Sequence, residues 1–158
     1  MRQTVRSVLF VAFALVVALS PSACGKDTKS AKAGTGTKPN VTVPSGNPPT
    51  TLQKKDLTVG TGAEAKAGQK VSVQYVGVAF STKKQFDASW DRGQPFSFSL
   101  GAGDVIKGWD EGVPGMKVGG RRQLVIPPDL AYGPNGYPPV IGPNETLVFV
   151  VDLVSVGS

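Results

Sequence analysis

The sequence predicts an α+β fold in which an antiparallel β-sheet closes over one short α-helix. Four segments between residues 52 and 158 have the hydrophobic pattern of β-strands, and only one stretch has the pattern of a helix. A sheet buries one face against another layer of structure, and the short helix is the candidate for that layer. Residues 52–158 are therefore expected to form one folded domain.

The first two strands are predicted from alternating hydrophobic residues. In residues 71–80 the side chains of Val71, Val73 and Tyr75 fall on one face. Residues 95–100 alternate in the same way, because successive side chains of a strand point to opposite faces. Their inward-facing residues are expected to be Phe96, Phe98 and Leu100.

The helix is predicted over residues 105–113. Asp104 stands where a helix N-cap residue would, and acidic residues follow in the first turns. The segment is short and contains Gly108 and Gly112, so packing rather than helix propensity must stabilise it.

Two further strands and a long loop complete the domain. Residues 121–126 form a strand that ends at Pro127, because proline cannot continue the hydrogen-bonded ladder. Residues 147–156 are apolar on both faces except at Asp152, which is typical of a central strand. The loop over 131–145 is rich in Gly, Pro and Asn, and loops of this length are often functional.

Residues 1–23 are predicted to be a signal peptide. Arg2 and Arg6 flank the start of an uninterrupted apolar run over residues 8–19. A bilayer-spanning helix needs about 20 apolar residues, so the run is too short to remain as a membrane anchor. The alternative is a buried core helix.

Cys24 is predicted to carry a lipid anchor. The segment Ser22-Ala23-Cys24-Gly25 resembles a bacterial lipobox, although Pro21 departs from its usual aliphatic residue. The sequence thus predicts an exported protein held at the cell membrane by lipidated Cys24. The alternative is cleavage and release of a secreted or periplasmic protein.

Residues 24–51 are predicted to be a disordered tether. They are rich in Thr, Gly, Pro and Lys and contain almost no large apolar residue, so they bury too little surface to offset the entropy of ordering. The alternative is an irregular loop of the domain.

The positive charge of the chain lies mainly outside the domain. Lys and Arg number 17 and Asp and Glu 11, a formal net charge of +6. Six of the basic residues and one acidic residue lie in residues 1–51, which leaves 11 basic and 10 acidic residues in 52–158. The domain has no basic stripe interleaved with aromatic residues, so no nucleic-acid partner is expected.

The residue types present exclude several kinds of chemistry. The chain has no His and one Cys, which excludes nucleophilic triads with an imidazole base, zinc sites and a disulfide within the chain. Neither nucleotide-binding glycine motif is complete. Asp87 and Asp91 lack the further ligands of a calcium loop and form a weak pair for hydrolysis. We therefore expect no metal and no cofactor.

Aromatic residues are the outstanding feature of the domain. For Phe98 an ordinary place in the core is the preferred interpretation, because aromatic side chains dominate core packing. For Phe86, Trp109 and Tyr132 a concave apolar pocket competes with it.

Seven motifs of the domain, in order, resemble the FKBP family of macrolide-binding prolyl isomerases. The similarity covers essentially all of residues 52–158 and none of 1–51. The motifs are VQYVG (73–77), KQFDAS (84–89), PFSFSLG (95–101), VIKGWDEGV (105–113), IPP (126–128), AYG (131–133) and LVF (147–149).

The resemblance implies a bent antiparallel sheet of five to six strands wrapped around one short helix, in a monomer. It implies peptidyl-prolyl cis-trans isomerisation, with proline-containing polypeptides as substrates and macrolides such as tacrolimus or rapamycin as ligands. The implied catalytic residues are Tyr75, Phe86, Asp87, Trp109, Tyr132 and Phe149. The implied substrate-binding residues are Arg92, Phe96, Val105, Ile106, Tyr137 and Ile141.

The resemblance also assigns roles within the pocket. Trp109 would form its floor, and the Ile106 N–H and the Tyr132 hydroxyl would donate hydrogen bonds to ligand carbonyls. Asp87 would lie at the rim beside Arg92. At Trp90 and Tyr137 the chain departs from the residues common in the family.

A chain without His suits this reaction, because rotation about a peptide bond needs no nucleophile, metal or proton relay. The planar amide is charge-separated, so an apolar pocket should disfavour it relative to the twisted amide. One alternative is a chaperone or peptide-binding module that uses the same pocket without significant turnover. Another is a β-rich adhesion or receptor domain on a stalk.

Overall fold

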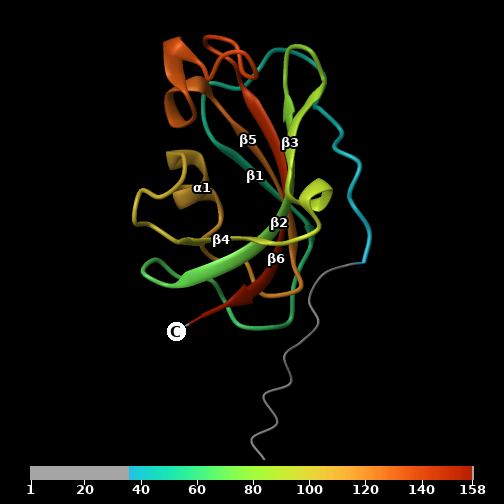
Figure 1. Ribbon diagram of the computed structural model, residues 1–158, viewed down its shortest axis with the longest axis vertical. Helices are drawn as coiled ribbons and strands as arrows, with labels where there is room; N and C mark the ends of the chain where they lie inside the picture. Colours follow the sequence, from blue (N-terminus) through green and yellow to red (C-terminus); the bar gives the residue numbers. More distant parts are fainter. Residues whose placement is uncertain (1–35, 158) are drawn as a thin grey trace, which may run out of the picture.

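The computed structural model describes residues 36–157, which form a single twisted sheet with one α-helix and three short 3₁₀ helices (Figure 1). In chain order the elements are β1 (Gln53–Thr58), β2 (Lys70–Ala79), β3 (Gln85–Ala88), η1 (Ser89–Arg92), β4 (Phe96–Ser99), α1 (Lys107–Gly112), β5 (Arg121–Ile126), η2 (Pro128–Leu130), η3 (Gly133–Asn135) and β6 (Leu147–Val156).

All strand pairs of the six-stranded sheet are antiparallel, in the order β1-β5-β6-β2-β3. β4 pairs with the first half of β2, and β3 pairs with the second half. β6 lies at the centre and its first seven residues are buried, as expected for a strand covered on both faces. The predicted α+β fold, an antiparallel sheet around one short helix, is confirmed.

The two helix glycines let α1 approach the sheet closely. A Cβ atom on Gly108 would lie 2.3 Å from Cγ2 of Ile126, and one on Gly112 would lie 2.8 Å from both Cδ atoms of Leu124. Both partners belong to β5. The six-residue helix is therefore held by contact with the sheet, and glycine is required on the face that makes this contact.

The start of the helix differs from the prediction. Asp104 is not the N-cap: Ile106 holds that position in an extended conformation, and no side chain caps the helix. The Asp104 carboxylate instead accepts a hydrogen bond from the Ser99 backbone N–H at 3.1 Å. This acceptor is engaged at the end of β4, and the helix begins at Lys107, two residues later than predicted.

The strands predicted from their hydrophobic patterns are present nearly as expected. Two more strands, β1 and β3, have no such pattern in the sequence. β5 and β6 match the predicted bounds, and β2 begins one residue early. All six residues of β1 are exposed, and β3 has only four residues. In β4, Phe98 is buried, while Phe96 is 38% exposed at the edge of a cavity.

Residues 36–51 differ from the disordered tether predicted over residues 24–51. They contain no helix or strand, but Val41 and Val43, together with Trp90, pack on a small buried cluster formed by Val76, Val78 and Ala88. The predicted signal peptide over 1–23, Cys24 and residues 25–35 lie outside the described residues. No helix of residues 36–157 is both long and apolar enough to cross a membrane.

Candidate active site

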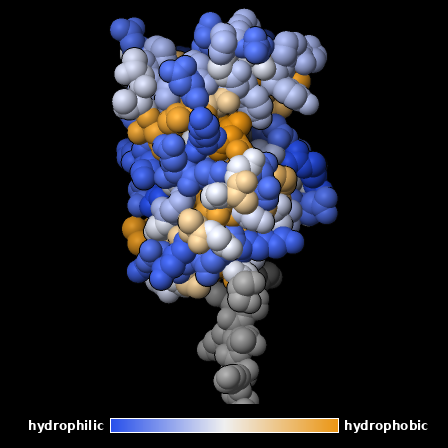
Figure 2. Space-filling view, turned by 90° about the vertical axis from the view of Figure 1, so that its left-hand side faces the viewer, coloured by the Kyte–Doolittle hydropathy of each residue, from blue (hydrophilic) through white to orange (hydrophobic). Residues whose placement is uncertain are grey.

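A cavity of about 190 Å³ opens between α1 and the sheet. Apolar residues gather around the middle of the face that carries α1, with polar residues around them (Figure 2). The cavity is lined by side chains from β2, β3, β4, α1, β6 and two loops, namely Tyr75, Phe86, Asp87, Phe96, Asp104, Val105, Ile106, Trp109, Tyr132 and Phe149.

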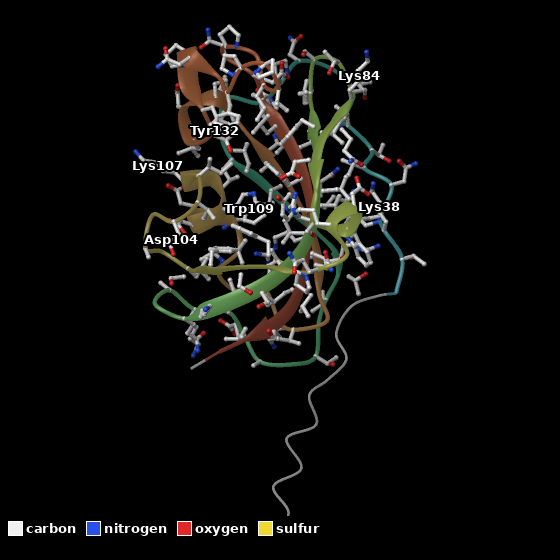
Figure 3. The ribbon with its side chains drawn as sticks, viewed as in Figure 1. Lys38, Lys84, Asp104, Lys107, Trp109 and Tyr132 are labelled. Carbon is white, nitrogen blue, oxygen red and sulfur yellow. The ribbon has the colours of Figure 1, made fainter. Side chains whose placement is uncertain are left out.

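Trp109 forms the floor of the cavity. Its ring is 4% exposed and lies between the helix and the strands (Figure 3). Its neighbours meet it edge to face, with centroid distances of 5.0 Å to Tyr75 and 5.2 Å to Phe149. The buried Nε1 of Trp109 has no hydrogen-bond partner within residues 36–157. This leaves a donor at the floor of an otherwise aromatic surface.

Phe86 and Phe149 form one wall of the cavity. Their rings meet edge to face at 5.5 Å, and both stand over Gly77 of β2. A Cβ atom at Gly77 would lie 2.7 Å from each ring, so only glycine leaves room for both. The glycine of the VQYVG motif thus sets the position of this wall.

Three polar side chains close a hydrogen-bonded triangle at the rim. The Tyr75 hydroxyl donates to one oxygen of Asp87, and the Arg92 guanidinium donates to the other oxygen. Arg92 also donates to the Tyr75 hydroxyl at 2.8 Å. Burial and the hydrogen bond to Asp87 raise the pKa of Tyr75 to about 12. The hydrogen bonds to Tyr75 and then Asp87 raise the pKa of Arg92. At neutral pH Tyr75 is therefore a neutral donor beside a charged pair.

Ser89 anchors this triangle to the sheet. It is fully buried, and its hydroxyl accepts a hydrogen bond from the Tyr75 backbone N–H at 2.8 Å while donating to the Gln74 side chain. Ser89 is the last residue of the KQFDAS motif, and the sequence predicted no role for it. A serine directly after a buried strand residue would have been the available signal.

Two donors at the mouth of the cavity are available to a ligand. Within residues 36–157 the Ile106 backbone N–H has no hydrogen-bond partner. The Tyr132 ring is 39% exposed and lies above Trp109 in Figure 3. Burial, followed by the neighbouring Tyr137, raises the pKa of Tyr132, so its hydroxyl remains protonated at neutral pH.

Nine of the twelve residues that the resemblance assigned to the site line the cavity, and three do not. Arg92 reaches the cavity through Asp87 and Tyr75. Tyr137 is 61% exposed and packs on Tyr132 at 5.6 Å. Ile141 is buried in the core. Asp104 lines the cavity but was predicted only as a helix cap. In the described part of the chain no group of three or more His, Cys, Asp or Glu side chains is placed to hold a metal ion.

An aromatic cavity between a short helix and a wrapped antiparallel sheet defines a class of small-ligand pocket. Comparison with known proteins identifies the family. A model of the FKBP-type peptidyl-prolyl cis-trans isomerase family matches residues 62–154. The chain therefore belongs to this family and is a peptidyl-prolyl cis-trans isomerase.

Individual relatives agree with this assignment. An FK506-binding protein of Streptomyces anulatus is 62% identical over 120 residues, 75% of this chain and 97% of the relative. A probable FK506-binding protein of Corynebacterium glutamicum is 55% identical over 119 residues, 75% of this chain and 98% of the relative. These matches are longer than the whole of residues 52–158, so they include residues before Leu52.

Solved structures show the same fold. The crystal structure of AtFKBP13 has a TM-score of 0.62 and 41% identity, and the match covers 66% of this chain and 91% of that one. FkpA from Escherichia coli has a TM-score of 0.61 and 45% identity, with 67% of this chain and 48% of FkpA covered.

Proposed function

We propose that the chain accelerates rotation about Xaa-Pro bonds of exported proteins by binding the proline ring against Trp109 and removing water from the amide. The supporting observation is a cavity of about 190 Å³ whose floor and walls are aromatic rings and whose mouth carries two available donors.

The environment of the amide carries the rate enhancement in this proposal. Rotation about the peptide bond faces a barrier of about 18–20 kcal/mol, because resonance gives the C–N bond partial double-bond character. Water favours the charge-separated planar form, whereas rings such as those of Phe86 and Phe149 do not. A millionfold acceleration corresponds to about 8 kcal/mol of differential stabilisation.

The polar groups would orient the peptide. The Ile106 N–H and the Tyr132 O–H can donate to the carbonyls on either side of the proline. Both oxygens of Asp87 are occupied, by Tyr75 and Arg92, so its charge is fixed in one orientation at the cavity wall. Preorganised charges of this kind act where charge changes as the amide twists.

Relaxation of a short Phe-Pro peptide from cis to trans tests this proposal. Uncatalysed relaxation takes tens to hundreds of seconds, and the purified full chain should make it much faster. Phe86→Ala should lower kcat/KM by about tenfold, because it opens the wall to water. The control Val59→Ala, at a residue that is 74% exposed, should match the wild type. Unaccelerated relaxation by folded wild-type protein would overturn the proposal.

We further propose that the macrolides FK506 (tacrolimus) and rapamycin occupy this cavity. The similar proteins of Streptomyces anulatus and Corynebacterium glutamicum are described as FK506-binding and probable FK506-binding proteins. In this chain the exposed Tyr137 beside Tyr132 would contact the part of such a ligand that extends beyond the cavity.

We also propose that the protein is exported and anchored at the cell membrane by lipidated Cys24. The support is the apolar run over residues 8–19 followed by the lipobox-like segment. Intact-mass analysis of cell fractions tests this. A membrane-bound form beginning at Cys24 with added acyl mass is expected, and a released form without acyl mass would refute the anchor.

A further inference from the structure

The N-terminal arm, residues 37–43, lies across the outer face of the sheet, on the side away from α1 (Figure 1). Three polar contacts hold it there. Lys38 Nζ lies 2.6 Å from an oxygen of Asp91. Arg121 donates to the Thr37 carbonyl at 3.2 Å, and the Gln123 side chain donates to the Thr42 carbonyl at 2.7 Å. The arm thus connects β5 with η1.

The same arm makes an apolar contact. Val41 and Val43 pack on a buried cluster that includes Ala88 of β3, and Trp90 of η1 packs on the same cluster. The remaining members of the cluster, Val76 and Val78, alternate along β2 with Tyr75 and Gly77, whose side faces the cavity. The arm therefore covers the reverse side of the strand that forms the cavity wall.

The four residues of η1 connect these two faces. Asp91 contacts the arm, and Trp90 packs on the same cluster as the two valines. Arg92 contacts Asp87 and the Tyr75 hydroxyl, and Ser89 accepts a hydrogen bond from the Tyr75 backbone N–H. In Figure 3, Lys38 and Trp109 lie on opposite sides of the strands. Asp91, which binds Lys38, is followed directly in the chain by Arg92, which belongs to the rim triangle.

Asp91 is held on both sides. Its second oxygen accepts a hydrogen bond at 2.7 Å from Gln85, the residue before Phe86. The hydrogen bonds from Lys38 and then Gln85 lower the pKa of Asp91, so the carboxylate stays charged at neutral pH. The arm, η1 and the start of β3 consequently meet at one charged group.

We propose that the N-terminal arm positions the isomerase site. Lys38 and the two valines fix η1, and η1 fixes Arg92 on Asp87 and Tyr75. The proposal rests on the role of the rim triangle in the proposed function. Lys38 does not line the cavity, yet it should affect turnover. Lys38 is thus a positioning residue rather than a catalytic one.

The first test compares kcat and KM of single variants in the full chain. Lys38→Met should lower kcat/KM by about two- to fivefold, the range expected for loss of one exposed ion pair that restrains a site. The loss should fall mainly on kcat, because the aromatic cavity that binds the proline is unchanged. Lys38→Arg should restore the wild-type value. The matched control is Lys66→Met, at an exposed lysine whose side chain forms no hydrogen bond or ion pair within the described residues.

The second test distinguishes positioning from simple stabilisation. Arg92→Met alone should lower kcat/KM, and adding Lys38→Met to it should cause no further loss, while the Tm still falls as in the single Lys38 variant. If Lys38→Met leaves kcat/KM unchanged, or lowers it equally with and without Arg92, the proposal is overturned. An unchanged kcat/KM in Arg92→Met would also overturn the proposal about the arm. The proposed function would still stand in that case if the wild type accelerates the reaction.

A variant of the apolar contact provides an independent check. Val41→Ser combined with Val43→Ser should detach the arm and lower kcat/KM at least as much as Lys38→Met. In folded protein, confirmed by an unchanged circular dichroism spectrum, a wild-type kcat/KM for this double variant would contradict the proposal.

Discussion

Asp87 shows how one residue combines packing and charge in this pocket. Its neighbour Phe86 forms the wall, while its own two oxygens are occupied by Tyr75 and Arg92. Its place at the rim was implied by the family resemblance of the KQFDAS motif. The resemblance also placed Asp87 beside Arg92, and the two side chains form an ion pair. The second donation of Arg92, to the Tyr75 hydroxyl, was not predicted, because it depends on the turn of η1.

Replacing Asp87 should affect activity more than stability. Asp87→Ala removes the fixed charge and leaves Arg92 without its ion-pair partner, so kcat/KM should fall about ten- to a hundredfold. Peptide relaxation kinetics measure this, and circular dichroism checks the fold. Asp129→Ala, at an exposed carboxylate of η2, is the matched control. Equal activity of the two variants would remove Asp87 from the mechanism.

Tyr75 should make stability fall at high pH. Its pKa is about 12 in the folded protein against an ordinary value of 10.0, so the folded state holds the proton more tightly than the unfolded state. The resulting stabilisation is fully present below about pH 10 and is lost as pH rises towards 12. Urea unfolding across this range should show the loss, and Tyr75→Phe should reduce it. An identical pH dependence in the variant would contradict this assignment.

At the scale of elements, periodicity predicted the long strands well and the edges poorly. β6 and β5 have patterns long enough to be unambiguous, whereas β1 is an exposed edge strand with no apolar face to reveal it. β3 was indicated only by the resemblance. The helix was placed correctly but not its start, because the side chain of Asp104 bonds the end of β4 instead. That choice depends on tertiary geometry.

The close packing of α1 on β5 predicts a strong effect of a small substitution. Gly108→Ala would place a Cβ within 2.3 Å of Ile126, so α1 must shift and carry Trp109 with it. Overpacking of this kind costs about 1–3 kcal/mol. We expect a lower Tm and a lower kcat/KM. Gly142→Ala, where a Cβ meets nothing within 4 Å, should be close to neutral. A wild-type Tm for Gly108→Ala would show that the helix has room to spare.

At the scale of the whole molecule, the two faces of the sheet have different functions. One face carries the aromatic cavity, and the other carries the N-terminal arm. The low hydrophobicity of residues 24–51 predicted a disordered tether, and it gave no sign that Val41 and Val43 pack on the sheet. The cavity was largely predictable because its residues belong to ordered motifs. The arm was not, because its partners lie far away in sequence.

The most direct test of the account is a titration of FK506 during cis-to-trans relaxation of a Phe-Pro peptide. One cavity is proposed both to bind the macrolide and to accelerate the reaction. Acceleration by the wild type should therefore fall to the uncatalysed rate as one equivalent of FK506 binds. Acceleration that persists in the fully macrolide-bound protein would contradict it, because catalysis would then occur outside the pocket lined by Trp109, Phe86 and Phe149.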